Sequence, residues 1–261
     1  MASDGLQVPY RTAGSGPIHI LFVHGLGADS SCWCRSPCYF APERFTLVFP
    51  DLLGVDTNKA VPTGTCSMED MAMGIEDVWV ALRQPRLHVV SHSMGCIPSL
   101  LFCERQPSAV ATFATAEGNL GPDDATMSRR IAQMGEVDFV RAYAKWTRLL
   151  DGALGREAPQ QSRLFLEALA KVPPFCLYRA ARSCFEWSVN GELLSRFARL
   201  PCPRAYIAGE WTIQRRGGLP SIDATAVLVV RAQGHFMMES AGEFYPWIRD
   251  WVERATVLGG P

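Results

Sequence analysis

Short runs of apolar residues recur along the chain, and Gly, Pro or Asp bounds them. Six runs are rich in β-branched or aromatic residues: IHILFV (18–23), TLVFP (46–50), LHVVSH (87–92), ATFATAE (111–117), RAYIAG (204–209) and TAVLVV (225–230). Their hydrophobicity is nearly continuous instead of alternating, which is typical of strands that are buried on both faces. The pattern therefore predicts a mostly parallel sheet that helices cover on both sides.

A helical period marks the segment SMEDMAMGIEDVWVAL (67–82) between two of these runs. Ser67 and Asp70 stand three residues apart at its start, which is the spacing of a capping box. Its apolar residues lie on one helical face: Met68, Met71, Ala72, Ile75, Val78 and Leu82. Because strands alternate with such helices, the chain is predicted to form a doubly wound α/β domain.

The alternation stops between Gly118 and about Pro203. Only helical pieces such as DFVRAYAKWTRLL (138–150) and SRLFLEALAK (162–171) are recognisable there. We therefore predict a core of residues 1–117 and 204–261, with a helical cap of residues 118–203 inserted between two strands. The large apolar side chains of the cap either line a pocket or pack against the sheet, and the sequence leaves this open: Phe139, Trp146, Leu149, Phe165, Phe175 and Trp187.

Composition and charge narrow the classes of partner. The 261 residues are 48% hydrophobic and 20% charged, as in a globular protein with a sizeable core. The formal net charge of -1 gives no reason to expect nucleic acid as a partner. The N-terminal stretch MASDGLQVPYRTAGSG does not resemble a signal peptide, and no run of about 18 apolar residues occurs. We therefore expect a cytoplasmic protein without a membrane partner.

Nine cysteines without a secretory signal are expected to be reduced thiols. Three of them cluster in SCWCRSPC, at Cys32, Cys34 and Cys38. Their CxCxxxC spacing has neither the CxxC pairs nor the distant second pair of a structural zinc site. No metal is therefore expected.

The segment LHVVSHSMGCIPSLLF (87–102) places Ser93 between a predicted strand and a predicted helix. A nucleophile elbow needs this order, with small residues on both sides of a nucleophile at the tip of a sharp turn. Gly95 meets that need after the serine. Ser91 replaces the first glycine of the G-x-S-x-G pattern, at a modest cost to close packing. We interpret Ser93 as an activated nucleophile.

Two further stretches supply what such a nucleophile requires. In LFVHGLG (21–27), a tight turn can aim the backbone N–H of Leu26 at the site, where with the N–H of Met94 it would form an oxyanion hole. His235 follows the last predicted strand and is free to act as general base. The other four histidines belong to strands, a turn or the elbow itself: His19, His24, His88 and His92.

The order of HGLG, SHSMG and GHF, with the succession of strands and the helical insertion, resembles the α/β-hydrolase superfamily over nearly the whole chain. In that pattern the insertion follows the sixth strand, which is the run at 111–117 here. The resemblance implies a serine nucleophile, a histidine base, an orienting acid, two oxyanion amides and no cofactor. By position, Ser93, His235, Leu26 and Met94 take all of these roles except that of the acid.

The acid is the point where the sequence departs from the family. Relatives usually carry an aspartate after the seventh strand, where this chain has Thr212, which cannot serve as an acid. Glu117 ends the sixth strand, a placement that resembles the acid of haloalkane dehalogenases. Glu210 in GEWT lies nearer to the usual position, and Asp223 is a further alternative. We favour Glu117 and keep the other two open.

Three hypotheses for function remain. The favoured one is a serine hydrolase that cleaves an ester, thioester or lactone of a medium-sized, largely apolar small molecule through an acyl-enzyme. The same triad could instead serve C–C bond hydrolysis, lyase, acyl-transfer or cyclisation chemistry, and a third reading is a non-catalytic ligand-binding protein. Serine at position 93 argues against an epoxide hydrolase or dehalogenase. A homodimer has no signature in the sequence and stays open.

Overall fold

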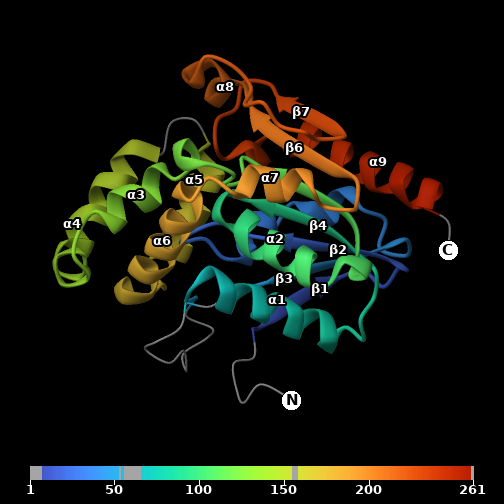
Figure 1. Cartoon of the computed structure of the whole chain (residues 1–261), viewed down its shortest axis with the longest axis horizontal. Coiled ribbons are helices and arrows are strands. Elements are labelled where there is room, and N and C mark those ends of the chain that lie inside the picture. Colours follow the sequence, from blue (N-terminus) through green and yellow to red (C-terminus); the bar gives the residue numbers. More distant parts are fainter. Residues whose placement is uncertain (1–7, 53, 56–65, 155–157, 260–261) are drawn as a thin grey trace.

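The computed structural model describes residues 8–52, 54–55, 66–154 and 158–259, and within them a seven-stranded sheet forms the centre (Figure 1). The strand order across the sheet is β1-β3-β2-β4-β5-β6-β7. The bounds of the strands are β1 Tyr10–Ala13, β2 Ile18–Val23, β3 Phe45–Pro50, β4 Leu87–His92, β5 Val110–Ala116, β6 Arg204–Gly209 and β7 Ala226–Val230. Every neighbouring pair is parallel except β1 with β3, so the predicted mostly parallel sheet is confirmed.

All six predicted strands are present, with ends that move by at most one residue. The sequence did not predict β1, which pairs antiparallel with β3 at the edge of the sheet. Its four residues, YRTA, are half-buried or exposed and mostly polar. An edge strand with so little apolar surface has no hydrophobic run by which it could be recognised.

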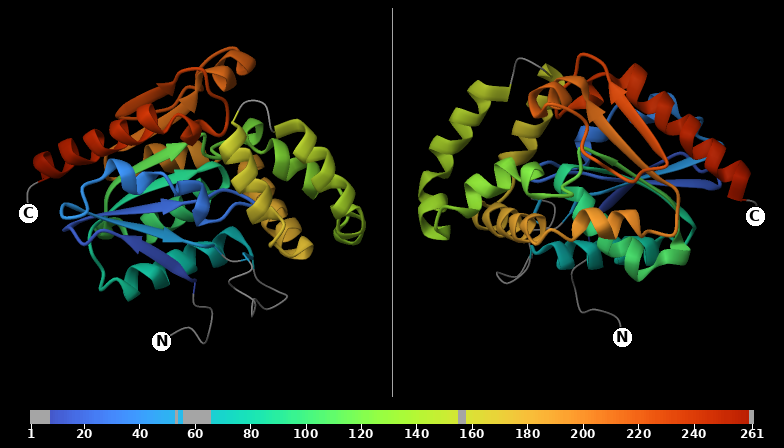
Figure 2. Two further views of the ribbon diagram at one scale, coloured as in Figure 1. Left: turned by 180° about the vertical axis from the view of Figure 1, so that it is seen from behind. Right: turned by 45° about the horizontal axis from the view of Figure 1, so that its top comes forward.

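Side chains alternate between the two faces of the sheet, and helices cover both. Leu21 and Val23 of β2 belong to a core shared with helices α1 (Met68–Ala81) and α2 (Cys96–Arg105). Ile20 and Phe22 point the other way, into a core with helix α9 (Ala241–Gly259). Figure 2 shows α9 behind the sheet, on the side away from α1 and α2. Burial on both faces explains the continuous hydrophobicity of these strands.

Helix α1 begins where its capping box predicts. The Ser67 hydroxyl accepts a hydrogen bond from the N–H of Asp70 at 3.1 Å, and the Asp70 carboxylate accepts one from the N–H of Ser67 at 3.0 Å. The helix then buries the predicted apolar face against the sheet. Two N–H groups of the first turn are thereby satisfied.

In the insertion between β5 and β6, the described residues form helices joined by short turns and loops, as expected from the sequence. Its helices are α3 Thr126–Ala132, α4 Glu136–Leu154, α5 Pro159–Leu169, α6 Pro174–Val189 and α7 Leu193–Ala198. Helices α3 to α6 gather at one end of the sheet, whereas α7 runs beside it (Figures 1 and 2). The ring of Phe197 in α7 lies 5.8 Å from that of Phe113 in β5. The family pattern counts the strand before the insertion as the sixth, whereas in this chain it is the fifth, β5. The division into core and cap domains stays a prediction.

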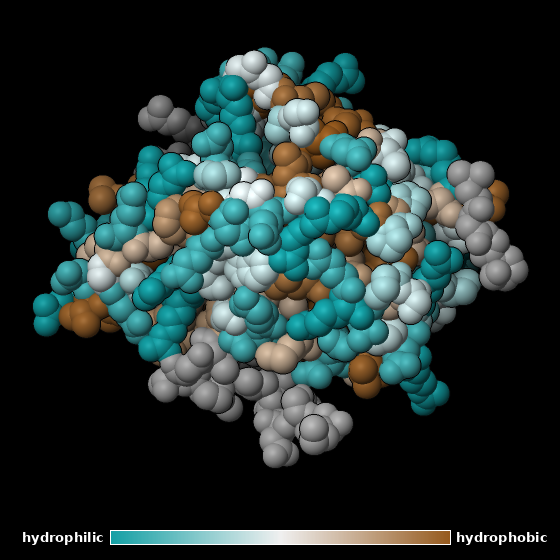
Figure 3. Space-filling model, viewed as in Figure 1, coloured by the Kyte–Doolittle hydropathy of each residue, from teal (hydrophilic) through white to brown (hydrophobic). Residues whose placement is uncertain are grey.

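Shorter elements complete the chain. Helix α8 spans Glu210–Arg216, directly after β6. The 3-10 helices are η1 Ser30–Trp33, η2 Ser36–Tyr39, η4 Ser93–Gly95, η5 Pro107–Ala109, η6 Pro122–Asp124 and η7 Met237–Glu239. Among the helices of the described ranges, none has both the length and the apolar character needed to cross a membrane. The face in Figure 3 is largely hydrophilic, with apolar side chains in separate patches.

Candidate active site

Ser93 stands at the turn between β4 and α2 in a left-handed backbone conformation, with φ of +53°. Two glycines let a neighbouring loop pack against this turn. A Cβ added at Gly95 would lie 2.4 Å from the carbonyl oxygen of His24, and one added at Gly25 would lie 3.0 Å from the Cβ of Ser93. A positive φ on a non-glycine residue is strained and is often found at functional sites. The predicted strand, turn and helix of the elbow are therefore present.

Ser91, which replaces the first glycine of the motif, is fully buried. Its hydroxyl donates a hydrogen bond to the hydroxyl of Thr115 in β5 at 3.0 Å, and Ala114 offers a carbonyl oxygen at 3.4 Å. The neighbouring strand thus satisfies the extra polar group. This contact explains how the elbow accepts a serine at this position.

The His-Gly turn after β2 is held by the side chain of His24. Its Nε2 accepts a hydrogen bond from the N–H of Leu52 at 2.9 Å, so Nδ1 carries the proton and donates to the carbonyl oxygen of Gly25, also at 2.9 Å. Burial lowers the pKa of this imidazole and keeps it neutral. His24 therefore fixes the loop that carries Leu26.

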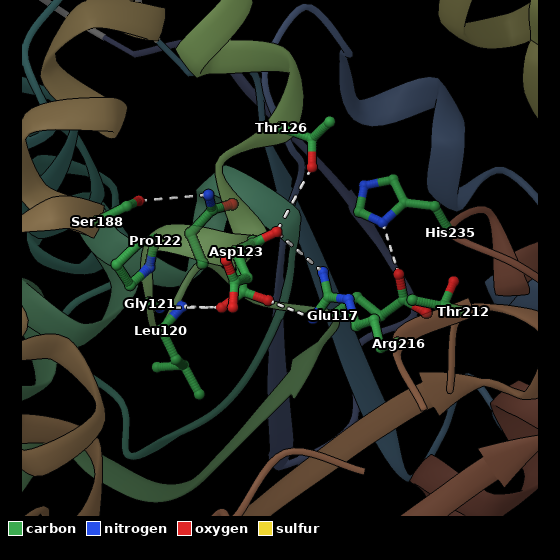
Figure 4. Close-up of polar contacts among 12 residues, drawn as sticks. Glu117, Leu120, Gly121, Pro122, Asp123, Thr126, Ser188, Thr212, Arg216 and His235 are labelled. Atoms are coloured by element: carbon green, nitrogen blue, oxygen red, sulfur yellow. Dashed lines mark hydrogen bonds and ion pairs between the residues drawn. The ribbon is translucent and has the colours of Figure 1, made fainter. Parts of the chain in front are cut away.

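Glu117 and His235 meet across the carboxyl ends of β5 and β7. The Nδ1 of His235 lies 2.8 Å from Oε2 of Glu117 (Figure 4). A carboxylate only accepts hydrogen bonds, so Nδ1 is the protonated nitrogen and Nε2 keeps a free lone pair in the neutral ring. Glu117 is 3% exposed and has φ of +43°, which places a second strained residue in this site.

The pKa of Glu117 is lowered to about 2. Burial by itself would raise this pKa, because it disfavours the charged form. Hydrogen bonds and the positive charge of His235 outweigh burial: Oε1 accepts the N–H of Gly209 at 2.9 Å, and the Thr212 hydroxyl also bonds to the carboxylate. Glu117 is therefore ionised at neutral pH, as an orienting acid requires.

The other two carboxylates considered from the sequence make different contacts. Glu210 accepts a hydrogen bond from the N–H of Ala232 at 2.8 Å. The Asp223 side chain is 75% exposed and lies 3.8 Å from Arg204. Among these three candidates, Glu117 is the carboxylate that contacts His235. The assignment of the acid rests on this contact and stays a proposal.

Two residues near this pair were given no role from the sequence. Thr212 stands where relatives carry the acid, and here its hydroxyl bonds to Glu117; Figure 4 shows the two side chains close together. His92 donates from Nε2 to the carbonyl oxygen of His235 at 2.9 Å, and the two rings are 4.6 Å apart. Burial lowers the pKa of His92 to about 3, so its ring is neutral. The position of His92, next to Ser93 at the end of a strand, was the signal in the sequence that could have indicated a role for it.

A cavity of about 1030 Å³ lies between the strand ends and the helical insertion. Ser93, Glu117 and His235 line its inner wall. Apolar side chains line much of the rest: Met127, Trp146, Leu150, Phe165, Leu194 and Ile222. Of the large cap residues singled out from the sequence, Trp146 and Phe165 therefore face the cavity. Leu149 is 67% exposed and Phe139 is buried within the insertion.

The predicted oxyanion residues lie around the same point. Leu26 lines the large cavity beside Ser93. Met94 is buried next to Ser93, and both Leu26 and Met94 border a second, much smaller cavity behind the turn. Their role as amide donors remains a proposal. Within the described ranges, His, Cys, Asp and Glu side chains form no group of three or more that could hold a metal ion.

The profile of the Alpha/beta hydrolase family matches residues 20–247, which includes the elbow, the insertion and the loop of His235. The chain belongs to this family. Membership accounts for the strand order, the elbow after β4 and the cavity above the strand ends. It does not specify the substrate or the acid.

Two curated relatives match the chain over about half of its length. An uncharacterized protein of Mycobacterium tuberculosis is 31% identical over 130 residues, which are 50% of this chain and 37% of that protein. The 2-hydroxy-6-oxononadienedioate/2-hydroxy-6-oxononatrienedioate hydrolase of Paraburkholderia xenovorans is 27% identical over 124 residues, which are 45% and 42% of the two chains. The matched region thus spans well under half of each relative.

Solved structures match over almost the entire chain. A thermophilic esterase from Thermogutta terrifontis has a TM-score of 0.76 with 18% identity and covers 95% of this chain and 93% of its own. At this identity the similarity shows the fold alone.

Proposed function

We propose that this family member is a serine hydrolase that cleaves an ester, thioester or lactone of a medium-sized, largely apolar substrate through an acyl-enzyme. One observation carries the proposal: an ionised, buried Glu117 holds the Nδ1 proton of His235 on the wall of a cavity that Ser93 also lines. This contact leaves the Nε2 of His235 available as a base. A histidine base and a serine that line one cavity are the groups that nucleophilic catalysis uses.

In the proposed reaction, Ser93 Oγ attacks the carbonyl carbon while His235 Nε2 takes the hydroxyl proton. The negative oxygen of the tetrahedral intermediate accepts hydrogen bonds from the N–H groups of Leu26 and Met94. His235 then gives its proton to the leaving alcohol or thiol. Water attacks the acyl-enzyme with His235 as base, and Ser93 recovers its proton as the carboxylic acid leaves. Glu117 stays ionised throughout and stabilises the charged imidazole.

The substrate class is inferred from the cavity wall. Side chains of the insertion such as Trp146 and Phe165 make much of the wall apolar, although charged residues such as Arg130 and Arg216 also line it. The volume of about 1030 Å³ fits a medium-sized ligand. The similar Thermogutta terrifontis structure is named an esterase, which agrees with ester cleavage. The Paraburkholderia xenovorans relative is named a hydrolase of a 2-hydroxy-6-oxo acid, which keeps C–C bond hydrolysis as the alternative.

The proposal is tested with p-nitrophenyl esters of increasing acyl length, measured with the parent protein and with Ser93→Ala. We expect saturable hydrolysis by the parent, best at intermediate chain length, and a loss of at least about 10³-fold in kcat with Ser93→Ala. Equal rates for the two proteins would overturn the proposal. If the parent binds the esters without turnover, the ligand-binding reading replaces it.

A further inference from the structure

Two buried cysteines from distant parts of the sequence meet beside the helical insertion. Cys66 precedes the N-cap residue of α1 and is fully buried, and Cys176 lies in the first turn of α6 and is 2% exposed. Their thiols hydrogen-bond to each other. A Cβ added at Gly54 would lie 3.7 Å from the Sγ of Cys66 and 4.0 Å from that of Cys176, so both sulfurs border one small space.

The start of α1 also contacts α6 about two helical turns beyond Cys176. The N–H of Met68 donates to the hydroxyl of Ser183 in α6 at 3.0 Å. α1 packs on the sheet, whereas α6 belongs to the insertion. Cys176 also borders the small cavity that Leu26 and Met94 line. A covalent bond at this point would tie α6 to the core directly behind the proposed oxyanion amides.

We propose that Cys66 and Cys176 are a redox modification site that forms a disulfide with a hydroperoxide as oxidant. The Cys176 thiolate attacks the outer oxygen of hydrogen peroxide, breaks the O–O bond and becomes a sulfenic acid, and a proton on the departing hydroxide gives water. The Cys66 thiolate then attacks the sulfenic sulfur. The S–S bond forms as the S–O bond breaks, and the departing hydroxide takes up the proton that the Cys66 thiol gave up and leaves as a second water. Peroxide is reduced by two electrons, and the two thiols supply them.

The pKa of the Cys176 thiol differs from that of other buried cysteines. The hydrogen bond from Cys66 lowers the pKa of Cys176 against the effect of its burial, and the charge of Arg179 adds to this. Burial instead raises the pKa of Cys96 and of Cys184 to about 12. Because the thiolate is the reactive form, Cys176 is the buried cysteine best placed to react first.

The test removes the exposed thiols Cys34 and Cys38, which would otherwise react before buried ones. The Cys34→Ser/Cys38→Ser protein is treated with an equimolar amount of hydrogen peroxide, quenched with N-ethylmaleimide and digested. Mass spectrometry should find one cross-linked peptide joining positions 66 and 176, which dithiothreitol cleaves. Recovery of both cysteines as N-ethylmaleimide adducts, or of Cys176 as a sulfinic acid, would overturn the proposal.

A second measurement does not depend on peptide recovery. A bridge between segments so far apart in sequence restricts the unfolded chain, so oxidation should raise the Tm by about 5 °C. In the same background, Cys66→Ser should show no rise on oxidation, provided that its circular dichroism matches that of the parent. A similar rise of the Tm in Cys66→Ser would contradict a disulfide between Cys66 and Cys176. Neither readout involves ester hydrolysis, so the result is independent of the proposed function.

Discussion

Glu117 and Thr212 contact each other although they follow different strands of the sheet. β5 and β6 are neighbours in the sheet, with Ala116 opposite Ile207. Side chains that follow the ends of these two strands can therefore contribute to the same site. In this chain the carboxylate directly follows β5, and Thr212, three residues beyond the end of β6, supplies a hydroxyl that bonds to it.

The first prediction concerns the acid. Glu117→Gln should lower kcat/KM for ester hydrolysis by about 10³- to 10⁴-fold, because the neutral amide no longer fixes the tautomer or stabilises charged His235. Glu210→Gln is the matched control, since Glu210 bonds to Ala232 instead, and it should keep activity within a few-fold. A large loss in the control with none in Glu117→Gln would transfer the role to Glu210.

The second prediction uses the pKa of Glu117, which is lowered from its ordinary value of 4.5 to about 2. A carboxyl whose pKa is depressed by folding stabilises the protein above pH 4.5, and this contribution is lost as the pH falls toward 2. It amounts to about 3 kcal/mol. The free energy of unfolding, measured with urea at several values between pH 6 and pH 2, should therefore fall less steeply with decreasing pH for Glu117→Gln than for the parent. Parallel curves would contradict the assigned ionisation.

Much of the site was predictable from local patterns, because Ser93 and His235 each follow a strand in a recognisable context. The acid was narrowed to three candidates and no further. The choice among Glu117, Glu210 and Asp223 depends on which carboxylate reaches the imidazole in space. His92 was missed for the same reason, since its partner is a backbone carbonyl more than 140 residues away in sequence.

At the scale of elements, the buried strands were predicted almost to the residue because each is a continuous apolar run between turn residues. β1 escaped prediction because an edge strand needs only one bonded neighbour and little apolar surface. The sequence also did not predict how closely the elbow approaches the His-Gly turn. It depends on distances between two loops, as the glycines at positions 25 and 95 show.

The third prediction tests that close approach. A Cβ at position 95 would lie 2.4 Å from a backbone oxygen, so Gly95→Ala must displace the elbow or the turn. We expect a loss of about 1–3 kcal/mol in unfolding free energy and at least a tenfold lower kcat/KM. Gly242→Ala is the control, because nothing lies within 4 Å of a Cβ there. Unchanged activity in Gly95→Ala would contradict the claim that the site requires this close approach.

At the scale of the whole molecule, the cavity arises where the helical insertion meets the strand ends. The placement of α4 and α5 over the sheet determines which residues of the insertion face the cavity. Local sequence patterns do not predict that placement. Leu149 and Leu150 are neighbours in α4, yet one is exposed and the other lines the cavity.

The fourth prediction exploits this pair of leucines. Leu150→Trp should fill part of the cavity and shift the preferred p-nitrophenyl ester toward shorter acyl chains, lowering kcat/KM for long chains by about tenfold while acetate is little affected. Leu149→Trp adds the same bulk to the outer surface and should leave the chain-length profile as it is. Identical profiles for both variants would mean that the acyl group does not occupy this cavity.

The central claim is that Ser93 is a nucleophile activated by His235 and Glu117. The most direct measurement is covalent labelling by a fluorophosphonate probe, followed over time by intact mass spectrometry in the parent, Ser93→Ala, Glu117→Gln and Glu210→Gln proteins. The account predicts one adduct per chain in the parent, none in Ser93→Ala, markedly slower labelling in Glu117→Gln and a near-parental rate in Glu210→Gln. Absence of labelling in the parent, or equal labelling of Ser93→Ala, would contradict it.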